Sequence, residues 1–495
     1  MRVYILTIFL SFLVFASIAQ NSNPQRLEVS SRDYSEVYGL PLENHKFIII
    51  KHNNRNSSRG EDWMLEVYNT SFEKKNNSSL FLPKGFVPVQ YRVQGDSVIY
   101  LAFSEAEGRK GSFMMYRYNF LSGLIWKKYI KGSRKSTFTS FELVGDKIII
   151  LGDRIEDISE QFADSDMPFN IKMVSPTLPK YSEVIASKSL EDNSRAILIV
   201  EVDKGEQMGL YYYQYDNTNN DLFSRKLESN KEVNIIDGSL VRSNDGSLLL
   251  MGSYNYDLGR DVSRERAIVH GTYIAKLEGA NFSFFRTNEF KDYKNIFGTL
   301  TMQQQKQLKQ KASKGKNISV AFKMLTHKKA IKQGELFIMA AESYIPEYHY
   351  ENSFDSRGYM YQQQVFDGYR TTNCVISAYN NKGSMIWDNY MHSNEIMDLA
   401  LHENILVFAD EDSNIVMAYY YDGAIYSKTV NGNSVVFKKS KDKIKTVHKE
   451  TIISEQYGRI EHWYDEYFLL TGHQVIFGQN GKKRKIYFFN LISFD

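Results

Sequence analysis

A short polar turn followed by four or five strand-forming apolar residues recurs eight times along this chain. The apolar runs begin at Phe47, Val98, Ile148, Ala196, Leu248, Leu336, Ile405 and Tyr467. The first five starts lie 48 to 52 residues apart, which is the spacing of blades in a β-propeller. The recurrence therefore predicts an all-β fold built from repeated sheets.

The segments after each run extend this prediction. A second strand rich in aromatic residues follows, then a turn of Asn, Asp or Gly, then a short outer strand. Near-continuous apolar runs fit inner strands that are buried on both faces, and alternating patterns fit strands with one solvated face. We expect about eight four-stranded blades, the last completed by an N-terminal strand near Arg26 to Ser30.

Other repeat architectures stay open at this point. Seven blades is the main alternative, because residues 155–167 are acidic and weakly patterned. A β-solenoid or two smaller β-domains would also repeat, although solenoid rungs are usually shorter than these units.

Two insertions interrupt the period, which stretches to 88 residues between Leu248 and Leu336. The first, at about 295–316, contains a run of good helix formers and predicts one helix near 301–313. The second, at 344–369, is rich in tyrosine. We predict one propeller domain over residues 20–495 that carries both insertions as projecting loops, where repeat proteins often hold their function.

The N-terminus has the pattern of an export signal over residues 1–19. Arg2 precedes an apolar stretch of 13 residues from Val3 to Phe15, and Ser17-Ile18-Ala19 offers small residues at the cleavage positions. The apolar stretch is shorter than the ~20 residues of a membrane-spanning helix. No cysteine adjoins the cleavage site, so we expect an exported protein that is not a lipoprotein, periplasmic or extracellular, with no transmembrane span in the mature chain.

Three C-terminal segments carry a resemblance, namely Phe366 to Thr371, Ile386 to Asn389 and Trp463 to Leu469. Through them, roughly the last 200 residues resemble an uncharacterised group of predicted exported proteins from Gram-negative bacteria. The resemblance implies export and a β-propeller fold. It implies no activity and no catalytic residue.

Metal and cofactor sites find no support in the sequence. The ten histidines lack metalloprotease spacing, and the single cysteine, Cys374, fits a small buried hydrophobe within a strand. Asp410 to Asn414 opens like a calcium loop, but Ile415 stands where that loop needs glycine. We expect a strand turn there, and neither metal nor cofactor.

Catalytic motifs are equally scarce. No Gly-x-Ser-x-Gly elbow occurs, and Ser243 to Ser247 predicts a hairpin turn. A glycosidase needs only two carboxylates, which 58 acidic residues can always supply, so acidic residues do not decide the question. The net charge of +3 on 119 charged side chains favours neither nucleic acid nor membrane.

Two segments are candidates for binding. From Met302 to Gly334 there are nine lysines and no acid, and Lys306, Lys309 and Lys311 could face an anionic partner or simply lie on a solvated helix. The tyrosine-rich insertion offers large apolar rings with one hydroxyl each, or else packs on itself. Its candidate residues are Tyr344, Tyr348, Tyr350, Tyr359, Tyr361 and Tyr369.

These features favour a non-enzymatic binding or scaffolding module of the bacterial envelope, with an envelope protein or a glycan as partner and no nucleic acid. The alternative is a polysaccharide-acting hydrolase or lyase with carboxylates in a central channel, a site that propellers also host.

Overall fold

The computed structural model describes residues 25–494, with gaps at 43, 58–59, 106–111, 131–136, 145–146, 154–181, 190–194, 204–205, 216–221, 228–232, 257–267, 279–280, 315–319, 355–356, 447–449 and 479–480. The predicted signal peptide, residues 1–19, and the weakly patterned segment 155–167 lie outside this part.

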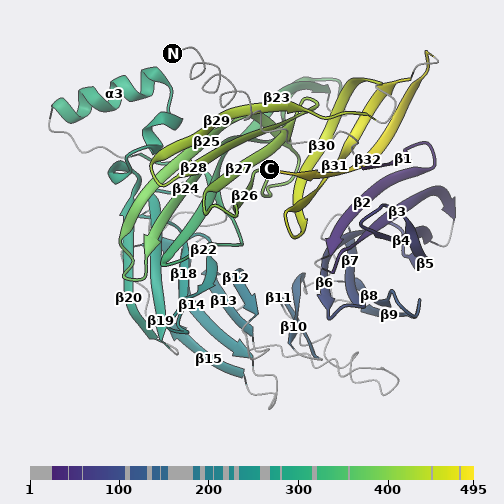
Figure 1. The fold of residues 1–495 in the computed structure, drawn as a ribbon, viewed down its shortest axis with the longest axis horizontal. Helices are drawn as coiled ribbons and strands as arrows, with labels where there is room; N and C mark the ends of the chain where they lie inside the picture. The colour runs from purple at the N-terminus through teal and green to yellow at the C-terminus, as the bar shows by residue number, and fades with distance from the viewer. Residues whose placement is uncertain are drawn as a thin grey trace, which may run out of the picture. The chain divides into compact units, whose positions relative to one another are not determined.

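The described residues form an all-β, propeller-like fold of eight antiparallel sheets (Figure 1). Sheets 1 to 4 follow one another along the chain. Sheet 1 contains β2 (Tyr34–Leu42), β3 (Lys46–Ser57), β4 (Gly60–Asn69) and β5 (Lys74–Leu82). Sheet 2 contains β6 (Phe86–Gln94), β7 (Val98–Glu105), β8 (Phe113–Asn119) and β9 (Ile125–Ile130). Sheet 3 contains β10 (Thr137–Val144) and β11 (Lys147–Asp153). Sheet 4 contains β12 (Ser182–Ser189), β13 (Arg195–Asp203), β14 (Glu206–Tyr215) and β15 (Leu222–Leu227).

Sheets 5 to 8 complete the described sheets. Sheet 5 contains β16 (Asn234–Ile235), β17 (Ser239–Arg242), β18 (Leu248–Asn255), β19 (Gly271–Glu278) and β20 (Asn281–Glu289). Sheet 6 contains β21 (Met324–Thr326), β22 (Ile331–Gln333), β23 (Leu336–Phe354), β24 (Met360–Asn380) and β25 (Met385–Asp398). Sheet 7 contains β26 (Leu406–Ala409), β27 (Ile415–Tyr421), β28 (Ala424–Asn431) and β29 (Ser434–Lys443). Sheet 8 contains β30 (Thr451–Tyr464), β31 (Tyr467–Phe477), β32 (Lys483–Ser493) and β1 (Arg26–Ser30).

The apolar runs form second strands rather than innermost ones. Seven of the eight begin β3, β7, β11, β13, β18, β23 and β31, each preceded in its sheet by another strand. In the sheets with four or five described strands, a second strand has neighbours on both edges. Such a strand can be apolar at every position when both of its faces are covered. In β18 all eight residues are buried.

The eighth run, at Ile405, is a correction to the predicted equivalence. It leads into β26, the first strand of sheet 7, and the second strand of that sheet is β27. Sheet 7 contains two apolar runs that each follow a polar turn, one from Ile405 and one from Ile415. The turn from Asp410 to Asn414 lies between them. The Asp410 carboxylate accepts the Asn414 backbone N–H at 2.7 Å, which confirms a strand turn there.

The predicted N-terminal closing strand is confirmed. β1 pairs with β32, with Arg26 opposite Asn490 and Ser30 opposite Ile486. The Arg26 guanidinium is buried and donates to Gln474 Oε1 at 2.7 Å and to Glu28 Oε1 at 2.8 Å. Sheet 8 therefore joins the first described strand of the chain to its last.

Internal contacts divide the chain into two compact units. One spans residues 1–84, 418–427 and 440–495, and the other spans residues 85–417 and 428–439. In the first unit, Phe47, Trp463 and Phe489 meet in one aromatic cluster, and Trp463 Nε1 donates to the Lys46 carbonyl at 2.7 Å. Sheets 1 and 8 thus share a core.

In the second unit, the half-buried Gln90 and the buried Asp237 each bond to backbone groups of the next sheet along the chain. Gln90 of β6 both donates to and accepts from the backbone of Phe141 in β10. Asp237 accepts the Thr326 N–H at 2.9 Å, which joins sheet 5 to sheet 6. Such bonds satisfy backbone groups that would otherwise be buried without a partner.

The predicted helix is confirmed as α3 (Met302–Ser313), the one α-helix of the described part. It follows two 3₁₀ turns, η1 (Phe290–Asp292) and η2 (Ile296–Thr299). Thr301 and Gln304 form a reciprocal capping box: the Thr301 N–H donates to Gln304 Oε1, and the Gln304 N–H donates to Thr301 Oγ1. No helix in the described residues is long and apolar enough to cross a membrane.

Candidate functional site

The tyrosine-rich insertion is a β-hairpin rather than an irregular loop. β23 and β24 run on for 19 and 21 residues, and their outer halves pair from Tyr344 opposite Thr371 to Phe354 opposite Met360. Residues that face each other across an antiparallel pair lie on the same face of the sheet. The register therefore assigns each side chain of this hairpin to one of two faces.

One face, here called the aromatic face, carries Tyr348, Tyr350, Phe354, Met360 and Phe366, together with the polar side chains of Asn352, Gln362 and Gln364. Tyr348 lies opposite Phe366, and their ring centroids are 5.4 Å apart. Tyr350 is 67% exposed and Phe354 is 69% exposed. Large apolar side chains left in water on one face are typical of an interaction surface.

The opposite face is mainly polar. It carries His349, Glu351, Ser353 and Gln363, together with Val365 and Tyr361. His349 Nε2 lies 2.9 Å from Glu351 Oε1, and its Nδ1 lies 2.5 Å from Asp367 Oδ1. Hydrogen bonds to these two carboxylates raise the pKa of His349. The hairpin is thus amphipathic, with one face more apolar and the other more polar.

The base of the hairpin is fixed by a bulge at Gly368. The register shifts between Glu347 and Tyr348, so that Asp367, next to Gly368, is an extra residue of β24 opposite no residue of β23. Gly368 has φ of 134°, and a Cβ there would come within 2.5 Å of the Asp398 carbonyl oxygen. Only glycine meets both conditions. The bulge brings the Tyr369 ring onto the Phe366 ring, with centroids 4.9 Å apart.

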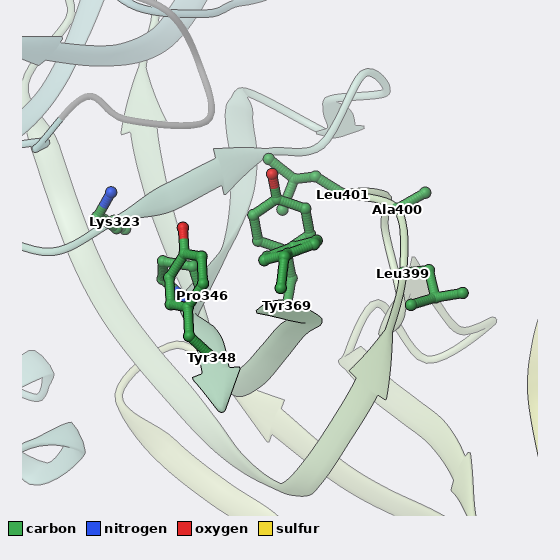
Figure 2. Close-up of a pocket in the computed structure, with 8 residues that line it drawn as sticks. Lys323, Pro346, Tyr348, Tyr369, Leu399, Ala400 and Leu401 are labelled. Atoms are coloured by element: carbon green, nitrogen blue, oxygen red, sulfur yellow. The ribbon is translucent and has the colours of Figure 1, made fainter. Parts of the chain in front are cut away.

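A cavity of about 660 Å³ lies at this base, on the side of the aromatic face. Its walls are formed by Lys323, Pro346, Tyr348, Phe366, Tyr369, Leu399, Ala400 and Leu401. Figure 2 shows Lys323 on one side of Tyr348 and Tyr369, with Leu399 to Leu401 on the other. The lining combines rings and aliphatic groups with two hydroxyls and one ammonium group. It contains no carboxylate, imidazole or thiol.

The cavity adjoins an open edge of the sheet. β24 pairs with β25 only as far as Tyr369 opposite Asp398, and its outer residues Met360 to Gly368 pair with β23 alone in the described structure. Edge strands that are protected against pairing with another chain usually carry lysine or proline. This edge has neither, and instead contains Gln362, Gln363 and Gln364.

The predicted binding residues fall into three groups. Tyr348, Tyr350, Tyr359 and Tyr361 are exposed on the hairpin, and Tyr369 is half-buried in the cavity wall. Tyr344 is 3% exposed and packs edge-on against Tyr369, so its ring contacts the cavity wall from the buried side. Lys306, Lys309 and Lys311 are exposed on α3 and do not line the cavity.

Sequence reasoning missed six cavity residues, namely Lys323, Pro346, Phe366, Leu399, Ala400 and Leu401. They come from four separate segments. Lys323 reaches the site because its carbonyl accepts the Tyr344 N–H at 3.0 Å. An apolar Leu-Ala-Leu just after the end of a strand is a weak signal that could have drawn attention to residues 399–401.

Other reactive groups in the described residues are engaged elsewhere. The buried carboxylates of Glu66, Glu142, Asp237, Glu342 and Asp388 all accept hydrogen bonds from neighbouring groups. Cys374 is buried, as predicted, and burial raises the pKa of its thiol well above the usual value. Among the described residues, no cluster of three or more His, Cys, Asp or Glu side chains could hold a metal ion.

Comparison with known proteins gives structural likeness only. No protein-family model matches the chain, and no curated protein matches it. Among solved structures, it is similar to the polysaccharide lyase Uly1, with 11% identity, TM-score 0.38, and coverage of 82% of this chain and 89% of the lyase.

It is also similar to the β-propeller domain of the Trilobed protease from Pyrococcus furiosus, with 10% identity, TM-score 0.33, and coverage of 91% of this chain and 95% of that domain. A protein of unknown function from Dyadobacter fermentans shares 7% identity at TM-score 0.32, with 97% of each chain covered. These similarities lie in the fold and say nothing of activity.

Proposed function

We propose that this protein is an exported, non-enzymatic binding module that captures an extended peptide segment of another envelope protein. The observation that carries the proposal is the junction of the open β24 edge with the aromatic-lined cavity. Export rests on the signal pattern of residues 1–19, from Arg2 to Ala19.

The edge provides the main-chain part of the interaction. Beyond Asp398, β25 leaves the sheet, and among the described residues none pairs with Met360 to Gly368 on that side. A peptide strand laid there would take the place that β25 gives up and would pair with β24 through backbone hydrogen bonds. Its side chains would alternate between the two faces of the hairpin.

The cavity provides the side-chain part. Side chains of the peptide on the aromatic face would contact Tyr348 and Phe366, and one of them could enter the cavity toward Leu399. The Tyr348 and Tyr369 hydroxyls and the Lys323 ammonium are hydrogen-bond donors, which suit carbonyl or carboxylate acceptors of a peptide. A cavity of about 660 Å³ is in the usual range for ligand sites.

Binding can be tested with a phage-displayed library of random peptides and a panel of neutral and acidic oligosaccharides as probes. We expect peptides to be enriched on the wild type. Tyr348→Ser combined with Phe366→Ser should weaken a selected peptide by 10-fold or more, since each buried aromatic contact is worth roughly 1 kcal/mol or more. Tyr361→Ser, on the polar face, is the matched control and should bind normally.

Hydrogen exchange locates the bound peptide. Pairing with the open edge should slow amide exchange within Met360 to Gly368, and leave exchange in α3 unchanged. Binding of oligosaccharides alone, or peptide binding without protection of that segment, would contradict the proposal.

A further inference from the structure

The lysine-rich helix α3 lies outside the proposed peptide site. Its own surface is rich in basic side chains. Lys306, Lys309 and Lys311 lie on α3, and Lys314 follows it; all four are exposed. Within the described residues none of these four forms an ion pair. From Met302 to Gly334 the sequence contains no acid, so this surface is positive at neutral pH.

Little of the helix is used for packing. Leu308 contacts the cluster that contains Ile296 and Tyr390, and Gln305 Nε2 donates to the Leu300 carbonyl at 3.0 Å. The other described side chains of α3 are exposed, and Figure 1 shows the helix standing out from the sheets. An isolated helix of 12 residues is only marginally stable in water. Here the packing of Leu308 and the Thr301–Gln304 capping box stabilise it.

Exposed apolar side chains accompany these lysines. Met302, at the start of α3, is 89% exposed. On β29, Val435, Val436 and Phe437 are 45%, 43% and 54% exposed, and the exposed Lys438 follows them. The two elements are linked, since Asn295, just before η2, donates to Asn433, just before β29, at 3.2 Å.

We propose that α3 and the first half of β29 form a docking surface for the anionic headgroups of a phospholipid bilayer. Charge complementarity supports the lysine part, because each basic residue near an anionic membrane adds attraction. The apolar part favours lipid over an acidic protein. Single protruding aliphatic and aromatic side chains can enter the boundary between headgroups and acyl chains, whereas a protein partner would need a groove to receive them.

Vesicle sedimentation tests the surface directly, with the full chain and two kinds of vesicle. We expect binding to phosphatidylcholine vesicles that contain phosphatidylglycerol, weakening as salt rises, and little binding to pure phosphatidylcholine. Replacing Lys306, Lys309 and Lys311 together by Gln should weaken binding about 100-fold, at about fivefold per lysine.

The matched control removes the same charge elsewhere. Lys84, Lys127 and Lys382 are also exposed, and replacing these three by Gln changes the net charge equally. This variant should keep most of the binding. Equal losses in the two variants would overturn the proposal, because the attraction would then come from total charge rather than from α3.

The apolar part has its own readout. Phe437→Trp should show a blue-shifted emission on anionic vesicles and quenching by brominated lipids, and Val435→Ser with Phe437→Ser should weaken binding. An unshifted, unquenched tryptophan, or binding to poly-glutamate in place of vesicles, would refute a lipid surface. Melting temperatures of all variants should match the wild type, since every substituted side chain is exposed.

Discussion

At the scale of single residues, Glu342 shows how this molecule uses a buried charge. The side chain is 1% exposed, and one carboxylate oxygen lies 2.8 Å from both His327 Nε2 and the Ile405 N–H. Both oxygens also lie within 3.1 Å of the Asn404 N–H. These contacts give the buried carboxylate hydrogen-bond partners and join sheet 6 to the segment that enters sheet 7.

Glu342→Gln should be strongly destabilising. The amide keeps one acceptor oxygen and turns an NH₂ group toward backbone donors, leaving buried N–H groups without partners. We expect a loss of about 2–4 kcal/mol in unfolding free energy, measured by chemical denaturation. Glu411→Gln, in an exposed turn, should change it by less than about 0.5 kcal/mol. Equal values for both would show that the network is not structural.

His327 gives this network a dependence on pH. Burial lowers the pKa of His327, but the hydrogen bond to Glu342 and the charges of Glu403 and Glu342 outweigh burial, and the net effect raises it. A raised folded-state pKa stabilises the protein fully below the unfolded value of about 6.5, and this contribution is lost as pH rises through the folded value.

The comparison with His327→Gln makes this measurable. The difference in unfolding free energy between the wild type and the variant should be constant below about pH 6.5 and should shrink at higher pH. His349 also has a raised pKa, so His349→Gln should show the same direction of pH dependence, but a smaller one because its side chain is exposed to solvent. A difference that grows with pH would have the wrong sign for a buried imidazolium.

At the scale of elements, the β23–β24 hairpin depends on one glycine for its direction. Gly358, near the tip, has φ of 83°, and a Cβ there would have open space around it, whereas Gly368 combines a positive φ with a close approach to Asp398. Gly358→Ala should cost about 1 kcal/mol from backbone strain alone. Gly368→Ala should cost clearly more and should also impair peptide capture, as judged by thermal melts and binding assays. Equal losses of stability in the two variants would mean that the backbone at Gly368 can accommodate a Cβ.

Much of this architecture could be predicted from local sequence. The turn-and-run repeat identified the second strands, and the helix formers after Thr301 identified α3. The hairpin was expected as a loop, although Tyr348 and Tyr350 alternate with His349 and Glu351 as in an amphipathic strand. The cavity could not be predicted, because Lys323, Tyr348 and Leu399 meet only through strand register and a bulge.

At the scale of the whole molecule, sheet 8 depends on a strand from the other end of the described chain. Deleting residues 26–30 would expose the edge of β32 and remove the bonds that Arg26 makes with Gln474 and Asn490. We expect a lower melting temperature and a tendency to aggregate, since an unpaired edge invites other strands. A synthetic peptide of residues 25–31 should restore the melting temperature. A deletion variant that melts like the wild type would contradict this role.

The pairing of β1 with β32 also constrains when this protein can finish folding. Arg26 and Asn490 are partners across 464 residues of sequence. Bringing two such distant points together costs about 5 kcal/mol of chain entropy if the intervening chain is disordered, and far less once the other sheets have formed. Completion of sheet 8 is therefore a late event, which must wait until the last strand has been synthesised. Until then, β1 has no β32 to pair with, and its edge is open to a strand from another protein, such as a chaperone.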